Sequence, residues 1–191
     1  MNSEKGSVIL LMIISVATLL VAVAGATFAY FGIKVGNESE KIIEATSGTL
    51  SVEYDTNSKI NAANLNPGDI VATKTFTVTG VITGSEHLNY EATLHVKNNT
   101  YTDGALVYTL TSKNVGNNGQ TFKATTKPVA IKSGASTIDL SVTPAKFAGP
   151  TPTGSTHEYT LTITYVNTGE DQSINAGKIF SGQLQVKQTT K

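Results

Sequence analysis

From residue 48 onward, apolar and polar side chains alternate one by one through most of the chain. In the clearest run, apolar residues occupy every second position, namely Leu88, Tyr90, Ala92, Leu94 and Val96. A period of two places such residues on one face of a β-strand. The same pattern predicts strands within residues 50–54, 70–82, 88–96, 106–110, 122–126, 129–132, 138–142, 158–165 and 180–187. No helical pattern separates them, which excludes a parallel α/β sheet.

Each expected strand has one apolar face and one polar face that is often rich in threonine. This is typical of antiparallel sheets with one buried and one solvated face. We therefore predict an all-β fold, a jelly-roll-like sandwich of two antiparallel sheets, with a Greek-key sandwich as the alternative. Pro67-Gly68 predicts a type II turn, the Asn-Gly pair within residues 116–119 predicts a hairpin, and residues 144–156 are expected to be the longest loop.

The N-terminal residues 7–31 contain no charged side chain. As a helix, this stretch is long enough to cross a hydrocarbon core of about 30 Å. It follows Lys5 and ends in small residues, the layout of a secretory signal with cleavage after Ala26 or Ala29. The predicted organisation is a signal peptide or membrane anchor at 1–29, a connector at 30–47 and a β-sandwich domain at 48–191.

Two other interpretations of the N-terminal stretch remain open. It has the length of a retained membrane anchor, although its flanks show little positive-inside bias. Lys5-Gly6 before an apolar helix also resembles a pilin leader, which a peptidase cuts before the helix so that the helix stays in a filament. The N-terminus of the native protein distinguishes all three.

Composition excludes several functions. The chain carries 14 basic and 14 acidic residues and no arginine, which argues against a nucleic-acid partner. Cysteine is absent, so the chain has no disulfide, no thiolate nucleophile and no cysteine-based zinc site. Absence of disulfides is compatible with secretion from a Gram-positive cell, and we expect a secreted or cell-surface protein.

The sequence shows no catalytic constellation, and we predict neither an enzyme nor a cofactor. His87, His95 and His157 are each interpreted as solvated surface residues. His157-Glu158 begins like a HExxH zinc motif, but Leu161 stands where the second histidine is required.

Loop acids offer one minor alternative. Asp103, Glu170 and Asp171 supply oxygen ligands of the kind that calcium prefers. Scattered loop acids are more often simply solvated, and no metal site is predicted.

Four motifs occur in a fixed order: ATFAYF at the end of the apolar stretch, SGTL at residues 47–50, LNPGD at 65–69 and KTFTV at 74–78. Together they resemble the TasA/camelysin family of secreted biofilm-matrix proteins, over about residues 20–97. The resemblance implies a jelly-roll domain that assembles into extracellular fibres by lending an N-terminal strand to its neighbour. Some members of that family carry a metallopeptidase label, which the missing HExxH motif does not support here.

These observations predict a secreted structural subunit of an extracellular fibre or biofilm matrix. Phe31, Ile33 and Val35 alternate with polar or small residues, so they are the candidate donor strand. The expected partners are further copies of the chain, other matrix fibre proteins and, before cleavage, the membrane. The alternatives are a membrane-anchored β-sandwich binding module, with Tyr101 as its candidate loop aromatic, and a pilin-like filament subunit.

Overall fold

The structure is a computed structural model and describes residues 41–42 and 48–189. The expected N-terminal helix, Ala26 and Ala29 at the predicted cleavage positions, and the candidate donor residues Phe31, Ile33 and Val35 lie outside the described residues. Among the described residues, no helix has the length and apolar character needed to cross a membrane.

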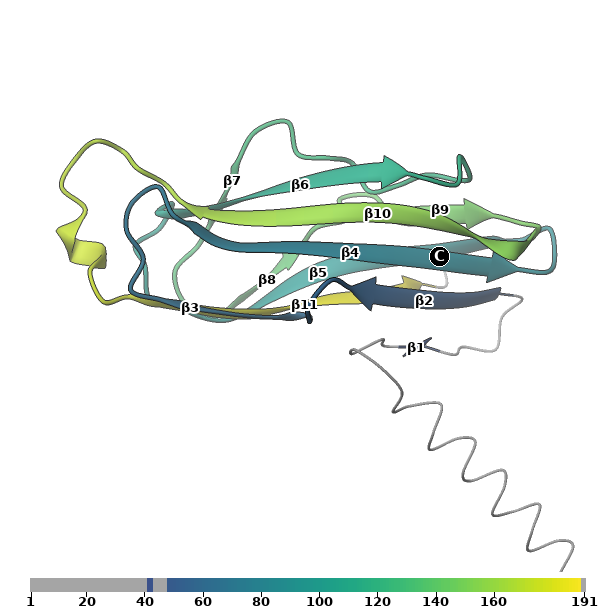
Figure 1. The fold of residues 1–191 in the computed structure, drawn as a ribbon, viewed down its shortest axis with the longest axis horizontal. Helices are drawn as coiled ribbons and strands as arrows, with labels where there is room; N and C mark the ends of the chain where they lie inside the picture. The colour runs from purple at the N-terminus through teal and green to yellow at the C-terminus, as the bar shows by residue number, and fades with distance from the viewer. Residues whose placement is uncertain (1–40, 43–47, 190–191) are drawn as a thin grey trace, which may run out of the picture. The chain divides into compact units, whose positions relative to one another are not determined.

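The described chain consists of strands and one short 3-10 helix (Figure 1). In chain order they are β1 (Lys41–Ile42), β2 (Gly48–Tyr54), β3 (Lys59–Ala63), β4 (Ile70–Ile82), β5 (His87–Asn99), β6 (Leu106–Asn114), β7 (Val129–Ile131), β8 (Ser136–Asp139), β9 (Ala145–Ala148), β10 (Thr151–Tyr165), η1 (Ser173–Asn175) and β11 (Ile179–Thr189).

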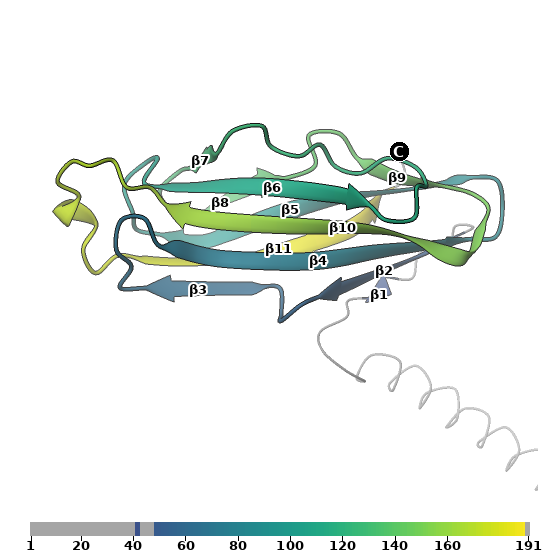
Figure 2. The ribbon, with the colours of Figure 1, turned by 45° about the horizontal axis from the view of Figure 1, so that its top comes forward.

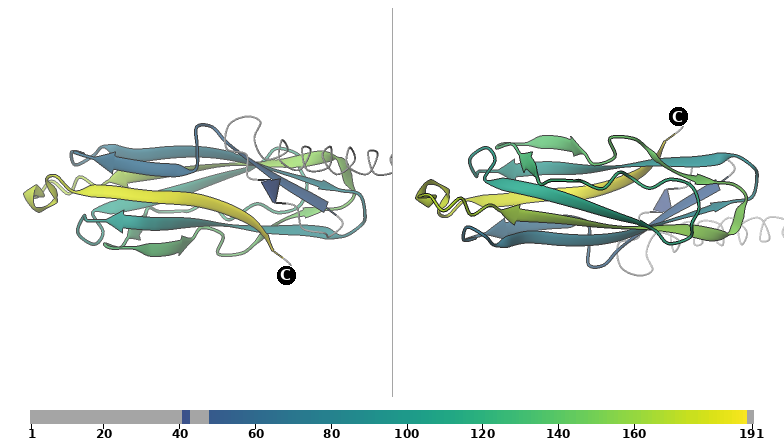
Figure 3. Two further views of the ribbon diagram at one scale, coloured as in Figure 1. Left: turned by 90° about the horizontal axis from the view of Figure 1, so that it is seen from below. Right: turned by 90° about the horizontal axis from the view of Figure 1, so that it is seen from above.

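The strands form two sheets, and every pairing is antiparallel. The first sheet has the order β1-β2-β4-β10-β6-β7, and the second has the order β3-β11-β5-β8, with β9 pairing a separate part of β5. In Figure 3, β11 lies in front in the view from below and β6 in the view from above, so the sheets are separate layers. The predicted all-β fold with two antiparallel sheets is confirmed.

Successive strands usually belong to different sheets. The chain passes from β2 in the first sheet to β3 in the second, and then from β4 in the first to β5 in the second. In Figure 2, β3 continues in the direction of β2, although it pairs in the other sheet. The sandwich is therefore closed by segments that cross between layers.

The core lies between the two sheets and follows the period-two pattern. In β5, for example, Leu88, Tyr90, Ala92, Leu94 and Val96 are all buried, while the residues between them face outward. Alternate residues of β4 and β10 meet them from the other sheet and belong to the same core cluster. Burying one large apolar side chain stabilises a fold by roughly 1.5–3 kcal/mol, so this interleaved core is the main reason that the two layers stay together.

The predicted hairpin at residues 116–119 and the predicted strand at 122–126 are wrong. After β6 ends, the chain crosses to the second sheet, where Gln120 pairs with Lys146 of β9. The Asn118 side chain holds this crossing, because its amide donates to the Ala148 carbonyl at 2.9 Å and its oxygen accepts from the Ala148 N–H at 2.8 Å. Phe122 is then buried without belonging to a strand.

Other local predictions had mixed outcomes. The turn at Asn66–Asp69 is confirmed, because the Asp69 N–H donates to the Asn66 carbonyl at 3.0 Å and Gly68 has a φ of 98°. Strand β3 lies where the residue pattern predicts no strand. The loop expected at residues 144–156 instead contains β9 and the first part of β10. In both regions, pairing with a neighbouring strand outweighs a weak local pattern.

Candidate functional site

Part of β4 is an unpaired strand edge within the described chain. β10 pairs with β4 along one side as far as Ile70, but β2 covers the other side only from Phe76 to Ile82. We call Ile70–Lys74 the open edge. The next strand, β3, does not continue the coverage, because it pairs with β11 in the second sheet. A strand edge of this kind exposes backbone N–H and C=O groups that a further strand can bind.

The backbone direction at the open edge follows from one hydrogen bond. The Asp55 N–H donates to the Thr75 carbonyl at 3.0 Å, so the polar groups of Thr75 point toward the β2 side. Backbone direction repeats every second residue in an antiparallel strand. The N–H and C=O of Thr73 therefore point toward the open side as well, away from β10.

A polar turn ends β2 and creates this edge. The Asp55 carboxylate accepts from the Thr56 N–H at 2.8 Å, and the Asn57 side chain accepts from the Lys59 N–H at 2.9 Å. Such local side-chain bonds compete with strand pairing and favour turns. The turn directs the chain into the second sheet and leaves β4 without a partner beyond this point.

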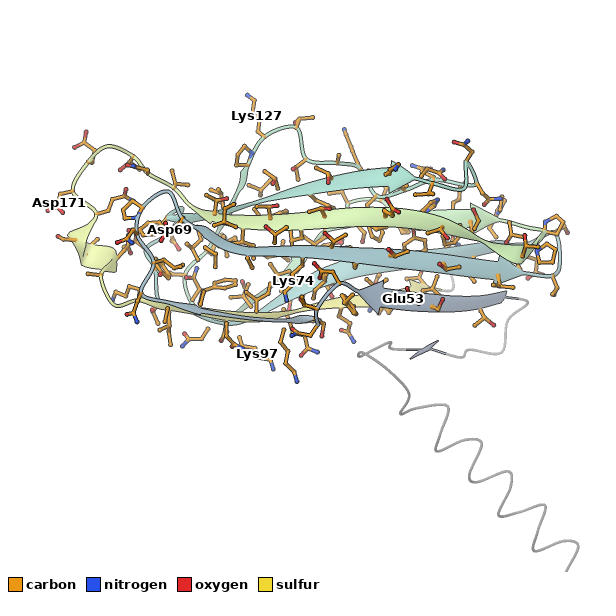
Figure 4. The ribbon with its side chains drawn as sticks, viewed as in Figure 1. Glu53, Asp69, Lys74, Lys97, Lys127 and Asp171 are labelled. Carbon is orange, nitrogen blue, oxygen red and sulfur yellow. The ribbon has the colours of Figure 1, made fainter. Side chains whose placement is uncertain are left out.

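Lys74 fastens the turn to β4. It faces the core side of β4 and is 8% exposed. Its ammonium donates to Thr56 Oγ1 at 3.0 Å and to Asn57 Oδ1 at 3.4 Å, at the end of β2 (Figure 4). A buried charge needs such partners, because an unsolvated ammonium is costly. The lysine therefore stabilises the corner where β2 leaves the sheet.

The open edge itself carries apolar side chains. Val71 and Ala72 are partly buried and pack against the core, and Ile70 is 62% exposed. An added strand at this position would meet both backbone polar groups and apolar contacts. These two features are what strand addition uses for affinity and for specificity.

The three histidines occupy different environments. His87 is exposed at the start of β5, as expected. His95 is on the outer face of β5, where it contacts the Thr93, Thr137 and Gln185 side chains. The prediction that His157 is solvated is wrong, because its exposure is 0%. The signal was its position, two residues before Tyr159 on the apolar face of β10.

His157 belongs to a buried relay of hydrogen bonds, which we call the Tyr-His relay (Tyr90, His157, Tyr159, with Asn118 and Phe122). The Phe122 N–H donates to the Tyr159 hydroxyl at 3.3 Å, and the Tyr159 and Tyr90 hydroxyls are 2.7 Å apart. The Tyr90 hydroxyl bonds to His157 Nδ1, and Nε2 lies 2.8 Å from the Asn118 carbonyl. A carbonyl only accepts, so Nε2 carries the proton and Nδ1 accepts from Tyr90.

Burial keeps the relay uncharged. Desolvation lowers the pKa of His157 below its usual value, and the bond to the Asn118 carbonyl opposes this only in part. Desolvation also raises the pKa of Tyr159 to about 12 and raises that of Tyr90 further. The Phe147 ring stacks on His157 with centroids 4.2 Å apart. The relay is thus a structural connection between the sheets, built from neutral groups.

The structure does not assemble the loop acids into a cation site. The Asp103 carboxylate accepts from the Ser133 N–H at 2.6 Å, and the Asp171 carboxylate accepts from the Ser173 N–H at 2.9 Å. These bonds lower the pKa of both carboxyl groups.

Tyr101, the candidate exposed loop aromatic, is buried instead. Its exposure is 1%, and its ring packs edge-on against Tyr165 with centroids 5.2 Å apart. A ring in this position is part of the core and presents no platform to a ligand.

These features define an antiparallel two-sheet β-sandwich protein in which one interior strand, β4, is paired along only part of one side. The chain belongs to the camelysin metallo-endopeptidase family, whose model matches residues 8–190. The resemblance predicted from the four motifs is thereby confirmed and extends well beyond them. No curated protein and no solved structure matches the chain.

The description of the family names a metal-dependent peptidase, but the described residues do not fit a catalytic metal. Residues 41–42 and 48–189 include no group of three His, Cys, Asp or Glu that is suited to hold an ion. Both ring nitrogens of His157 already have partners, and Leu161 is buried in the core.

Proposed function

We propose that this protein is a secreted, cell-surface or matrix structural subunit that polymerises into an extracellular fibre by strand donation. The observation that carries the proposal is the open edge of β4. Family membership supports it, because the TasA/camelysin resemblance implies fibre assembly. The finer description of the sandwich as a jelly roll is part of the same proposal.

The donor in this proposal is the segment Phe31–Val35 of a neighbouring subunit. It contains five residues, as does the open edge Ile70–Lys74. Extended, it presents Phe31, Ile33 and Val35 on one face. That face would pack beside Val71 and Ala72, while its backbone would bond to Thr73.

The test uses one variant on each side of the contact. Ile33→Asp places a charge on the apolar face of the donor. Thr73→Pro removes the N–H that points toward the open side, and Thr73→Val is the matched control because it retains the N–H. We expect Ile33→Asp and Thr73→Pro each to give folded protein without fibres, whereas Thr73→Val polymerises normally.

Mixing the two defective variants sharpens the test. Ile33→Asp keeps an intact acceptor, and Thr73→Pro keeps an intact donor, so one productive contact remains available between them. The mixture should give heterodimers but no long fibres, as measured by light scattering and electron microscopy. Normal fibres from either single variant would overturn strand donation at this edge.

Localisation has its own test. The mass of the native protein separates cleavage after Ala26 or Ala29 from a retained anchor or a pilin-like cut near Gly6. Loss of the first 26 or 29 residues supports the secreted subunit. An intact N-terminus would favour the membrane-anchored surface module instead, and loss of only the first few residues would favour the pilin-like subunit.

A further inference from the structure

The outer face of the first sheet carries an ordered array of threonines. Register pairs Thr73 with Thr162 and Thr75 with Thr160 across β4 and β10. On the other side of β10, these rows continue to Thr109 and Thr111 of β6. Strands lie about 4.8 Å apart, and alternate residues along a strand lie about 6.8 Å apart. The threonines therefore form a regular grid, which we call the threonine face.

The grid is well ordered and largely uncharged. Thr75 and Thr160 have their hydroxyl oxygens 3.4 Å apart, and Thr79 and Thr156 have theirs 3.3 Å apart. Threonine is β-branched, so its side chain loses little rotamer freedom when a surface is covered. Methyl and hydroxyl groups are also much less costly to remove from water than charges.

The two outer faces of the sandwich differ in charge. The second sheet has charged residues dispersed over its outer face, among them Glu91 with Lys187 as an ion pair at 2.8 Å, and the exposed Lys97 (Figure 4). On β2, β4, β10 and β6, the described outward charges fall in a single row across the threonine face. That row runs Glu53, Thr77, Glu158 and Lys113.

The row is complementary to itself. Glu53 lies at its β2 end and Lys113 at its β6 end, where Lys113 pairs with Glu158 at 3.8 Å. A two-fold axis that runs along the strands between β4 and β10 exchanges β2 with β6 and β4 with β10. In the resulting dimer, Glu53 of each copy would lie opposite Lys113 of the other copy. Thr75 of each copy would likewise lie opposite Thr160 of the other. Isologous interfaces need this kind of self-complementarity.

We propose that the threonine face is an interface for a second copy of this chain, packed face to face about that two-fold axis. The Glu53 row spans all four strands and the three threonine rows beside it span three strands each, so the strand spacings give roughly 400 Å² on each copy. Such an area is at the low end for a specific contact. A single pair is therefore weak, and repetition along a polymer would add avidity.

The first test cross-links the predicted neighbours. The chain contains no cysteine, so Glu53→Cys and Lys113→Cys each introduce one thiol. Both are combined with Ile33→Asp, which removes strand donation if the proposed function is correct. A short bismaleimide should link the two variants when they are mixed, and should link neither variant to itself.

The second test reverses charges in the full-length protein that also carries Ile33→Asp. Glu53→Lys or Lys113→Glu should weaken self-association roughly tenfold, because two symmetric pairs become repulsive. The double exchange Glu53→Lys with Lys113→Glu should restore it. Lys97→Glu, on the outer face of the other sheet, should have no effect. Sedimentation velocity gives the dissociation constants.

The outcomes separate this proposal from strand donation. Cross-links between the mixed variants, with charge rescue, support the interface even if fibres never form. The face-to-face interface is overturned if the Glu53→Cys and Lys113→Cys variants do not cross-link when they are mixed, or if all charge variants associate with the same dissociation constant. Either result overturns it even if fibres assemble normally. A threonine face that serves another partner, such as a polysaccharide, would give that second result.

Discussion

The Tyr90 hydroxyl of β5 lies 2.7 Å from the Tyr159 hydroxyl of β10, so the two sheets are joined by a hydrogen bond inside their shared core. Both side chains are almost fully buried. The bond belongs to the Tyr-His relay, which starts at the Phe122 N–H and ends at the Asn118 carbonyl. The relay therefore also holds the segment that crosses between the sheets after β6.

Removing the Tyr90 hydroxyl should destabilise the fold strongly. Tyr90→Phe leaves His157 Nδ1 without a donor and the Tyr159 hydroxyl without its acceptor. Buried polar groups that lose their partners cost about 1–3 kcal/mol each, so we expect a loss of about 2–4 kcal/mol in the free energy of unfolding. Tyr108→Phe, which removes a hydroxyl away from the relay, is the control and should cost less. Chemical denaturation measures both, and equal losses would contradict the relay.

Stability should fall in mildly acidic solution because of His157. Its pKa in the folded state is lowered from 6.5 by burial, so the unfolded chain binds a proton more readily. The contribution of neutral His157 to the free energy of unfolding is fully present above pH 6.5 and decreases as the pH drops below that value. It decreases no further once the pH is below the folded-state pKa. The slope of the free energy of unfolding against pH reaches at most about 1.4 kcal/mol per pH unit for one proton.

Variants assign this slope to His157. His157→Phe should flatten the dependence between pH 5 and 7, whereas His87→Gln, at an exposed position, should leave it unchanged. The charge-free surroundings of His157 support the assignment, because Tyr90, Tyr159 and Phe147 face its ring. A slope that persists in His157→Phe would show that another group titrates.

Asn118→Ala should loosen the crossing segment. The change removes both hydrogen bonds between the Asn118 amide and the Ala148 backbone. We expect a cost of about 2 kcal/mol, at roughly 1 kcal/mol for each bond. Asn61→Ala, on the exposed side of β3, is the control. Hydrogen exchange at Gln120 and Phe122 should accelerate in Asn118→Ala alone, and unchanged protection there would argue against this anchor.

Gly119→Ala should be more damaging than Gly134→Ala. Both glycines have positive φ, at 72° and 81°, so both changes incur backbone strain of about 1–2 kcal/mol. Only at Gly119 would the new Cβ clash with another chain segment, at the carbonyl oxygen of Lys146. Thermal denaturation should therefore show a much lower melting temperature for Gly119→Ala, and similar values for both variants would contradict this packing.

Family membership and the strand alternation were accessible from the sequence, but the open edge was not. The LNPGD motif directly precedes β4, and the KTFTV motif lies within it. Nothing in either motif indicates that β2 stops opposite Phe76. That limit arises because residues 55–58 turn the chain into the second sheet. The threonine grid was also hidden, because it requires the register between strands that are far apart in the chain.

The order of apolar and polar residues is enough to tell which side of each strong strand is buried, because the backbone of a strand turns alternate side chains to opposite faces. The same rule places His157 on the buried side with Tyr159 and Leu161, although an imidazole ring is polar. The folded chain alone shows which strands pair, where the chain changes sheets and why Phe122 is buried outside a strand. Those outcomes depend on contacts between distant segments, which local periodicity does not encode.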